Sequence, residues 1–403
     1  MPRKSPFFDR TLSACASMAW KEWGGYYAAC SYETTHEFEY FAFRHAAGLL
    51  DATPLFKYDV RGQDAAAFLS RVMVKDISRL RIGRVAYVCW CTDQGKIVDD
   101  GTVMRLEEDR FFVTASEPNY AWFKSLSRRY DVDITDITDT VCALALQGPT
   151  SRDILRQCCD ADLDHLRYFD VTQTSIDGRP VQLSRTGYTG DLGFEIFMTN
   201  NHALPVWDAI TSAGALYNLL PAGLDALDMT RIEAGLILNG VDYFNGAHVL
   251  TGDRMSSPFE LPLGWMVDLD RDPFVGQRAL RREKRHGSSW STVGLEISWP
   301  DVETLYHRHG LPPQVPGRAW RSSVPLFRSG RQRQIGYATS GTWSPTLKKY
   351  IALATIQSAY AHPGNKIGFE ITVEHVHYTV SATVCNNQFY NPPRKRSTPA
   401  SDG

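Results

Sequence analysis

Alternating hydrophobic and polar positions run through the middle of the chain and are interrupted by segments with the period of an α-helix. Residues 141–157 (VCALALQGPTSRDILRQ) predict a buried strand that leads into a helix. Residues 181–190 and 193–198 predict two strands joined by a glycine-rich turn. Helices are predicted at 203–215 and after Pro221. This mixture indicates an α+β body.

The N-terminal third shows the same mixture of patterns. Asp93, Gln94 and Gly95 supply a turn between two stretches of β-forming residues, which predicts a hairpin. The predicted elements are a helix at 33–50, a strand and helix within 55–74, the hairpin at 84–106, a strand at 109–116 and a helix at 119–130.

The C-terminal part changes character near residue 288. Residues 301–330 hold Pro, Gly and basic residues, and we expect an irregular linker there. Beyond it the pattern predicts strands only, at 335–341, 350–356, 366–374 and 378–384. The polar, proline-containing end at 391–403 predicts a disordered tail.

Composition narrows the class of protein without specifying its chemistry. The chain has 403 residues, 43% of them hydrophobic, and a formal net charge of −2, which is typical of a soluble globular protein of two or three domains. The near-neutral charge gives no drive toward nucleic acid or a membrane. The start lacks the apolar core of a secretory signal, and the eight cysteines form no CxxC pair, so we expect a cytoplasmic protein with reduced thiols.

Five separated motifs resemble one family, in its order along the chain. They are ALQGPTSRDIL at 145–155, RTGYTGDLGFEIF at 185–197, RIEAGL at 231–236, GKIVDDG at 95–101 and GYATSGTWSPTLKKYIALA at 336–354. Together, over roughly residues 38–385, they resemble the glycine-cleavage T-protein (aminomethyltransferase) superfamily, whose members are tetrahydrofolate-dependent one-carbon transferases and include demethylases.

The resemblance implies a three-domain cloverleaf with a central folate channel and a C-terminal, barrel-like β domain. Tetrahydrofolate would be the methyl acceptor. The implied division places folate-binding α+β regions at 1–140 with parts of 240–285, a central α+β domain at 141–240, a barrel-like domain at 288–390 and the tail at 391–403.

Glu195 is the first candidate for binding folate. On a strand, Phe194 and Ile196 point one way while Glu195 and Phe197 point the other. One carboxylate can accept both donors of a pterin edge, the ring N–H and the exocyclic amine. The resemblance implies this role for Glu195; the alternative is a solvated glutamate on an edge strand.

Three further residues are candidates for the folate site. Tyr188 could stack on or bond to the ligand, or belong to a plain hairpin turn. Arg231 is implied by the resemblance to contact folate, although Asp228 three residues earlier could simply hold it. Gln147 is a candidate pocket neighbour, with helix entry as the alternative.

Asp99 and Asp100 are the candidates for catalysis on the hairpin. The strand period sends their side chains to opposite faces, so one of them faces a pocket that this strand lines. The resemblance implies that one aspartate lies near the folate nitrogens and the transferred carbon. We expect Asp100, with Asp99 as the alternate; an aspartate pair capping a turn is the other interpretation.

Tyr243 departs from the glycine-cleavage pattern. Residues 239–244 read NGVDYF, where those proteins carry a sequence like YGNDID, and related demethylases favour a tyrosine. A phenol could give a proton to a leaving oxygen or sulfur, or it could be an aromatic packed under the helix. Residues 51–56 (DATPLF) also lack the histidine found in both groups.

These residues lead to one main functional hypothesis and two alternatives. The main hypothesis is a demethylase that moves a methyl group from a small O-, S- or N-methyl substrate to tetrahydrofolate, giving 5-methyltetrahydrofolate. The alternatives are a glycine-cleavage aminomethyltransferase that makes 5,10-methylenetetrahydrofolate and a non-catalytic folate-binding protein. We expect no metal site at His375 and His377, no nucleic-acid or membrane partner, and a chain compatible with a homodimer.

Overall fold

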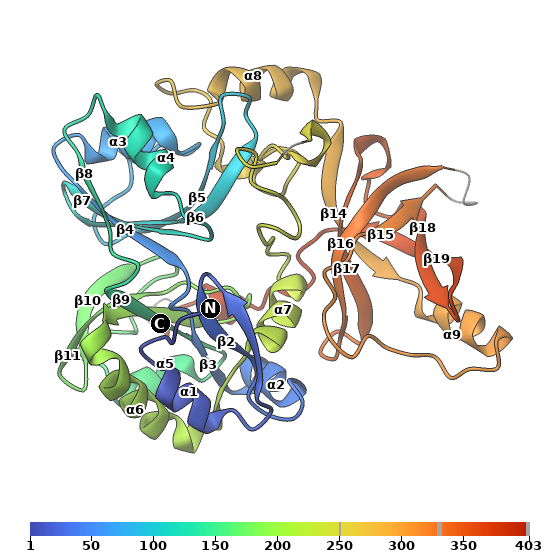
Figure 1. Ribbon diagram of the computed structural model, residues 1–403, viewed down its shortest axis with the longest axis horizontal. Coiled ribbons are helices and arrows are strands. Elements are labelled where there is room, and N and C mark those ends of the chain that lie inside the picture. Colours follow the sequence, from blue (N-terminus) through green and yellow to red (C-terminus); the bar gives the residue numbers. More distant parts are fainter. Residues whose placement is uncertain (250, 329–332, 400–403) are drawn as a thin grey trace.

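A six-stranded sheet forms the lower body of the computed structural model, which describes residues 1–249, 251–328 and 333–399 (Figure 1). Its strands are antiparallel except for the parallel pair β13 and β3. The order is β10 (Val171–Ile176), β11 (Arg179–Ser184), β12 (Gly193–Thr199), β9 (Val141–Gln147), β3 (Ala47–Asp51) and β13 (Leu219–Pro221).

Helices and a small N-terminal hairpin surround this sheet. Phe194 and Ile196 of β12 lie in its core together with Phe7 and Leu49. The surrounding elements are α1 (Phe8–Ala14), β1 (Ala19–Trp23), β2 (Tyr26–Ser31), α2 (Glu37–His45), α5 (Ser151–Arg156), η1 (Asn200–His202), α6 (Ala203–Gly214), η2 (Ala215–Tyr217) and α7 (Leu224–Glu233).

The N-terminal segment corrects two expectations. The helix predicted at 33–50 is shorter, because α2 ends at His45 and Ala47–Asp51 form β3, which pairs with two strands of the central sheet. Gly48 allows this close return, since a Cβ there would lie 2.5 Å from the ring of Phe43. The strand at Ala47–Asp51 therefore joins the central sheet, although the predicted division groups it with the first folate-binding region. Trp23, Ala28 and Leu50 also belong to the apolar cluster that contains Phe112 of the upper sheet.

A five-stranded sheet forms the upper body. It contains the predicted β5–β6 hairpin, whose turn uses Gly95 at a φ of +73°. The order is β5 (Val85–Cys91), β6 (Ile97–Glu107), β7 (Arg110–Ala115), β4 (Phe56–Arg61) and β8 (Asp133–Asp136). Beside it lie α3 (Ala65–Val72), α4 (Tyr120–Ser127), η3 (Gly252–Arg254), η4 (Gly264–Met266) and α8 (Gln277–His286).

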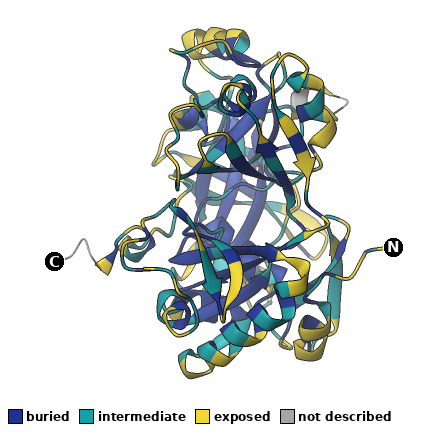
Figure 2. Cartoon of the chain, turned by 90° about the vertical axis from the view of Figure 1, so that its left-hand side faces the viewer, coloured by how far each residue is buried: buried dark blue, intermediate teal, exposed yellow. Residues whose placement is uncertain are grey.

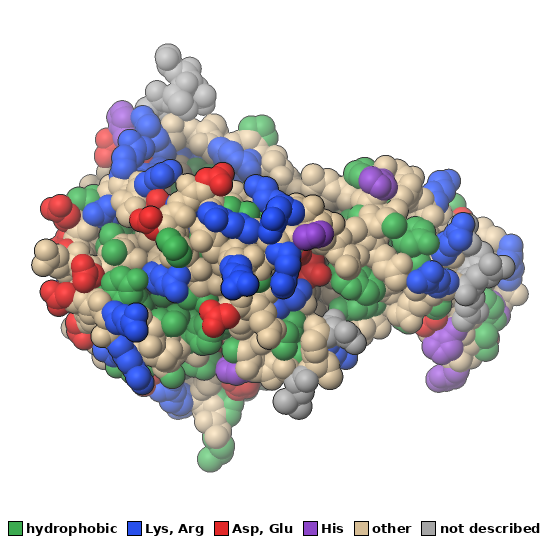
Figure 3. Space-filling model, turned by 90° about the horizontal axis from the view of Figure 1, so that it is seen from above, with side chains coloured by type: hydrophobic (Ala, Val, Ile, Leu, Met, Phe, Trp, Pro, Cys, Tyr) green, Lys and Arg blue, Asp and Glu red, His purple; other side chains and the backbone are tan. Residues whose placement is uncertain are grey.

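The two sheets meet through apolar side chains. Phe112 of β7 packs edge-on against Phe197 of β12, with ring centroids 5.0 Å apart. Buried residues fill the central strands of both bodies, while exposed residues lie on helices, on loops and on outer parts of the sheets such as β8 and the start of β11 (Figure 2). The face of β12 that carries Glu195 is therefore directed toward the upper body. Seen from above, Lys and Arg side chains gather over the region of α8 (Figure 3).

A closed barrel forms the third body and confirms the predicted fold class. Its order is β14 (Trp290–Ile297), β17 (Lys349–Gln357), β16 (Gln334–Ser344), β15 (Val324–Phe327), β18 (Lys366–Val373) and β19 (Val376–Cys385), with η5 (Ser358–Tyr360) between β17 and β18. An irregular linker was expected at 301–330, but its first part, up to Arg308, belongs to helix α9 (Trp299–Arg308). Ser298 caps this helix by accepting from the Asp301 N–H, and Pro300 fits its first turn.

The tail corrects another expectation. Residues 391–399 were predicted to be disordered, but they contain η6 (Pro393–Lys395) and return to the lower body, where the C-terminus is marked (Figure 1). Polar contacts outweigh the low hydrophobicity that favoured disorder, since Arg394 is paired with Asp191. Residues 400–403 lie outside the described part. No helix in the described part is long and apolar enough to span a membrane.

Candidate functional site

Asp99 and Asp100 lie on β6 with their side chains on opposite faces, as the strand period predicts. Asp99 is fully buried, and every contact of its carboxylate is structural. Its donors are the backbone N–H groups of Asp100 and Glu117, the hydroxyl of Ser116 and the side-chain amides of Asn119 and Asn239. Asp99 therefore ties the hairpin to the loop before α4 and to the segment that precedes Tyr243.

Asp100 has a sparser environment than its neighbour. Its carboxylate accepts hydrogen bonds from two phenols, Tyr87 at 2.7 Å and Tyr243 at a short distance. Burial, and then the adjacent charge of Asp99, raise the pKa of Asp100 to about 6. Burial raises the pKa of Asp99 to about 6 as well, so the two carboxylates differ in their partners. Among the described residues Asp100 has no bonded cation and no backbone donor, which leaves it available for a functional role.

Tyr243 is both a packed aromatic and a phenol that reaches a candidate catalytic residue, so both interpretations of its position apply. It is 1% exposed and packs with Cys89 and Leu261, yet its hydroxyl donates to Asp100. Burial, followed by the charge of Asp100, raises its pKa well above the usual value, so the phenol keeps its proton. Tyr87 was not among the predicted site residues. The hairpin register pairs Cys89 with Asp100, and Tyr87 lies two residues before Cys89 on the same face of β5, so this register was a signal for it.

Glu195 lies on β12 as the alternation predicts. Phe194 and Ile196 are in the central core, and Phe197 faces the upper sheet. Within the described residues, the carboxylate of Glu195 accepts one hydrogen bond, from the hydroxyl of Thr186. Burial raises its pKa. Its remaining acceptor positions are open to a ligand that carries N–H groups.

Gln147 anchors the turn between β11 and β12. Its amide nitrogen donates to the Thr186 and Phe194 carbonyls at 3.2 and 3.3 Å, and its oxygen accepts from Thr189 at 3.1 Å. A Cβ at Gly187 or Gly193 would lie 1.9 or 2.2 Å from this oxygen, so these glycines admit Gln147. Contact of Gln147 with folate stays a prediction, since its observed bonds go to the turn.

Tyr188 and Arg231 connect the turn with the rest of the site. The Tyr188 hydroxyl donates to the Ile237 carbonyl at 2.5 Å. Its pKa is raised by burial, and the charges of Arg231 and Asp100 both act on it. Tyr188 therefore joins the turn to the segment that follows α7, which contains Ile237.

Arg231 is fully buried on α7 between two carboxylates. Its Nε donates to Asp228 at 2.8 Å, as the alternative interpretation expected, and its Nη1 donates to Asp242 over a short distance. Asp242 also accepts from Thr339 and Ser340 of the barrel, a long-range contact that no local pattern indicates. The Nη2 of Arg231 has no hydrogen-bond partner in the described part of the chain.

These groups fit tetrahydrofolate. The ligand offers N–H donors on its pterin and carbonyl and carboxylate acceptors elsewhere, while Glu195 has open acceptor positions and Arg231 Nη2 is a buried donor without a partner. A surface hollow of about 470 Å³ lies elsewhere and has Lys75, Trp265 and Asp268 in its lining.

His375 and His377, where no metal site is expected, lie in different elements. His375 lies in the turn after β18 with a φ of +68°, whereas His377 is on β19. Among the described residues no group of three or more His, Cys, Asp or Glu is arranged to hold a metal ion.

Comparison with known proteins places the whole chain. Residues 8–271 match the GCVT N-terminal domain, and residues 307–391 match the glycine cleavage T-protein C-terminal barrel domain. An aminomethyltransferase of Thermoanaerobacter sp. (strain X514) is 34% identical over 363 residues, covering 89% of this chain and 90% of that protein. One from Desulforamulus reducens is 33% identical over 373 residues, covering 92% and 94%.

A solved structure shares the fold. The crystal structure of the glycine cleavage system aminomethyltransferase T from Bartonella henselae superposes with a TM-score of 0.82 at 23% sequence identity, covering 99% of this chain and 100% of that one. The chain therefore shares the three-body fold of the Bartonella henselae protein.

Proposed function

Since the chain belongs to the glycine cleavage T-protein family, and its relatives indicate a one-carbon transferase, we propose that it is an aminomethyltransferase. It would pass the carbon of an aminomethyl group to tetrahydrofolate, giving 5,10-methylenetetrahydrofolate, with the amino nitrogen released as ammonia. The curated relatives named aminomethyltransferase, which align over nearly the whole of both chains, favour this reaction over demethylation.

The observation that carries the proposal is the environment of Asp100. Its carboxylate is held by Tyr87 and Tyr243, has no bonded cation, and has a pKa of about 6. It is therefore ionised at neutral pH and able to stabilise positive charge that develops near the transferred carbon, or to take a proton from an amine nitrogen. Asp99 would act as a positioning residue, because its carboxylate is occupied by structural donors.

Binding of the acceptor would rest on two other side chains. Glu195 would accept from the pterin edge, and Arg231 Nη2 would donate to a carbonyl or carboxylate of the same ligand. Tyr188, whose hydroxyl is bound to the Ile237 carbonyl, would offer its ring to the ligand. The main contribution of the protein would be alignment of donor and acceptor.

A second candidate is the tetrahydrofolate-dependent demethylase, and Tyr243 favours it. Its hydroxyl hydrogen-bonds to Asp100 and keeps its proton, so it would be placed to donate a hydrogen bond to a leaving oxygen or sulfur, although its raised pKa makes it a weak acid. In that reaction a methyl group would pass from a small O-, S- or N-methyl compound, and the product would be 5-methyltetrahydrofolate.

The two candidates differ in the mass of the folate product. The purified protein would be incubated with tetrahydrofolate and either an aminomethylated lipoyl carrier or a panel of O-, S- and N-methyl compounds, with folates read out by mass spectrometry. We expect 5,10-methylenetetrahydrofolate from the carrier. Formation of 5-methyltetrahydrofolate from a methyl compound alone would replace the first candidate by the second. Folate binding without any turnover would support a non-catalytic protein.

A further inference from the structure

The segment 386–399, called here the C-terminal strap, leaves the barrel after β19 and crosses to the lower body (Figure 1). We propose that the strap positions the turn at 185–195, so that Arg394 is a positioning residue for folate binding. This inference rests on the proposed function, in which Glu195 at the end of that turn binds the pterin. Three sets of contacts support it.

The first contact holds the middle of the turn. Arg394 donates to both oxygens of Asp191, at 2.7 and 2.8 Å, and the Tyr390 hydroxyl donates to the same carboxylate at 2.9 Å. The Asp191 side chain is fully buried and also accepts from the Leu192 N–H at 2.7 Å. A planar guanidinium that binds both oxygens fixes position and orientation together. Asp191 is four residues from Glu195.

The second contact holds the start of the turn. Arg185, directly after β11, is fully buried and donates to the strap carbonyls of Ser397 at 2.6 Å and Lys395 at 3.2 Å. Its third main acceptor is the Leu166 carbonyl at 3.0 Å. Burial lowers the pKa of Arg185 to about 10. Loss of the strap would leave this buried cation without two acceptors, so the start of the turn would rearrange.

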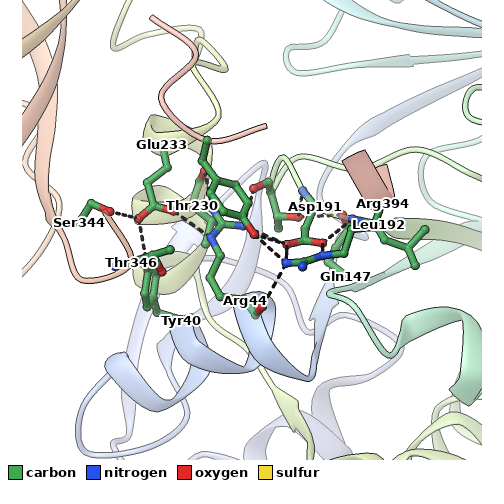
Figure 4. Close-up of polar contacts among 12 residues, drawn as sticks. Tyr40, Arg44, Gln147, Asp191, Leu192, Thr230, Glu233, Ser344, Thr346 and Arg394 are labelled. Atoms are coloured by element: carbon green, nitrogen blue, oxygen red, sulfur yellow. Dashed lines mark hydrogen bonds and ion pairs between the residues drawn. The ribbon is translucent and has the colours of Figure 1, made fainter. Parts of the chain in front are cut away.

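The third contact joins the strap to the end of α7. The Tyr390 N–H donates to the Glu233 carbonyl at 2.8 Å, and the Asn387 amide donates to the Gly235 carbonyl at 3.0 Å. Arg44 lies between the Asp191–Arg394 pair and Glu233 (Figure 4). The strap thus bridges the turn that carries Glu195 and the helix that carries Arg231, and it sets the distance between the two proposed folate contacts.

The strap is not required for the apolar core beneath the turn. The core of the lower body is built from residues between Phe7 and Ile210, and no strap residue belongs to it. The contacts of Arg394 and Tyr390 with Asp191 are polar and lie at its edge, with the Arg394 side chain 41% exposed. Removing them should loosen the turn while the sheet stays folded.

The test compares Arg394→Ala with a matched control, Arg10→Ala. Arg10 makes the same two-pronged contact with Asp208, at 2.7 and 2.7 Å, on an exposed part of the lower body far from the turn. For Arg394→Ala we expect the KM and Kd for tetrahydrofolate to rise about tenfold or more with kcat changed less than about twofold. Arg394→Lys should fall between wild type and Arg394→Ala, and Arg10→Ala should match wild type.

A second measurement is independent of folate. Hydrogen exchange in peptides covering 185–195 should be faster in Arg394→Ala than in wild type or Arg10→Ala, with the barrel unchanged. Tyr390→Phe, which removes one hydroxyl, should show a smaller change in the same direction. Unchanged exchange in 185–195, or unchanged tetrahydrofolate affinity in both strap variants, would overturn the inference. Failure of the wild-type protein to bind tetrahydrofolate would instead overturn the proposed function and, with it, the folate role of the strap.

Discussion

Glu233 and Asp100 are both buried carboxylates, but their surroundings differ. Glu233 is paired with Arg44 at 2.8 and 2.6 Å and accepts from the hydroxyls of Tyr40 and Ser344, so both of its oxygens are occupied (Figure 4). Asp100 has two phenols, no bonded cation and a second carboxylate as its neighbour. A saturated carboxylate joins elements, whereas an under-compensated one is available for chemistry.

Asp100 and Glu233 also affect the stability of the folded protein in opposite directions. The folded-state pKa of Asp100 is raised to about 6, above its unfolded value, so the folded protein binds this proton more tightly. Its contribution to stability is therefore lost as pH rises through about 6, and the ionised carboxylate is a cost at neutral pH. The network of Glu233 carries its own counter-charge. The ionised Asp100 site is thus maintained at a cost in stability. The network of Arg44, Glu233, Tyr40 and Ser344, called here the joint, contributes to stability.

The largest effect is expected from breaking the joint. Arg44→Met removes the cation from Glu233 and leaves a buried, unpaired carboxylate, so the free energy of unfolding should fall by about 3 to 5 kcal/mol. Urea denaturation measures this change. Arg10→Ala, which breaks an exposed pair of similar geometry, should cost less than about 1 kcal/mol. Equal losses in the two variants would remove the distinction drawn between joint and surface.

The next effect is on turnover. Asp100→Asn removes the charge that the reaction uses, and kcat should fall by about 10²- to 10³-fold. The thermal midpoint at pH 7 should stay level or rise, because the cost of the buried charge disappears. Asp99→Asn should instead lower the midpoint, since its donors lose a charged acceptor. Near-normal turnover in Asp100→Asn would exclude the proposed role.

A smaller effect is expected at Glu195. Glu195→Gln keeps the shape but replaces one acceptor oxygen by a donor, so tetrahydrofolate should bind about 10- to 100-fold more weakly. Titration calorimetry measures the affinity. Thr172→Val on β10, which is separated from β12 by β11, is a suitable control because the Thr172 hydroxyl bonds to the backbone carbonyl of Gln173. Unchanged affinity in Glu195→Gln would show that the pterin binds elsewhere.

The smallest effect is expected at Tyr243, and it separates the two candidate reactions. Its hydrogen bond lowers the pKa of Asp100, so Tyr243→Phe should move the rising limb of the pH–kcat profile, near pH 6 in wild type, to higher pH. Aminomethyl transfer at pH 8 should fall by about tenfold or less. A far larger loss confined to O- or S-methyl substrates would support demethylation. An unchanged pH–kcat profile in Tyr243→Phe would show that Tyr243 does not set the pKa of Asp100.

Local patterns predicted the parts of the site that are local. The strand period alone placed Asp99 and Asp100 on opposite faces, and Glu195 on the face opposite to Phe194. It does so because successive side chains of a strand alternate between the two faces of a sheet. The hairpin turn followed from Gly95. The glycines of the turn were also visible, but their packing against Gln147 was not, since that contact requires the β9–β12 pairing.

The missed features depend on contacts between distant parts of the chain. The tail from residue 391 looked disordered because it has few apolar residues, and its contacts with distant residues such as Asp191 and Arg185 explain why residues 391–399 are ordered. Ala47–Asp51 were absorbed into a helix because four apolar residues in a row suit either element. The role of Thr339 and Ser340 at Asp242 depends on how the barrel docks, which no local period specifies.

Asp242 and Tyr243 are adjacent in the chain but point to different partners. The first is bound to Arg231 and to the barrel, and the second is bound to Asp100. Under the proposed function, a change of the side chain at 243 would leave the Arg231–Asp242 contact in place, so the preference for a donor would be able to evolve separately from the choice of acceptor. This makes position 243 a natural starting point for retargeting the enzyme, with Asp242 left untouched as its fixed backing.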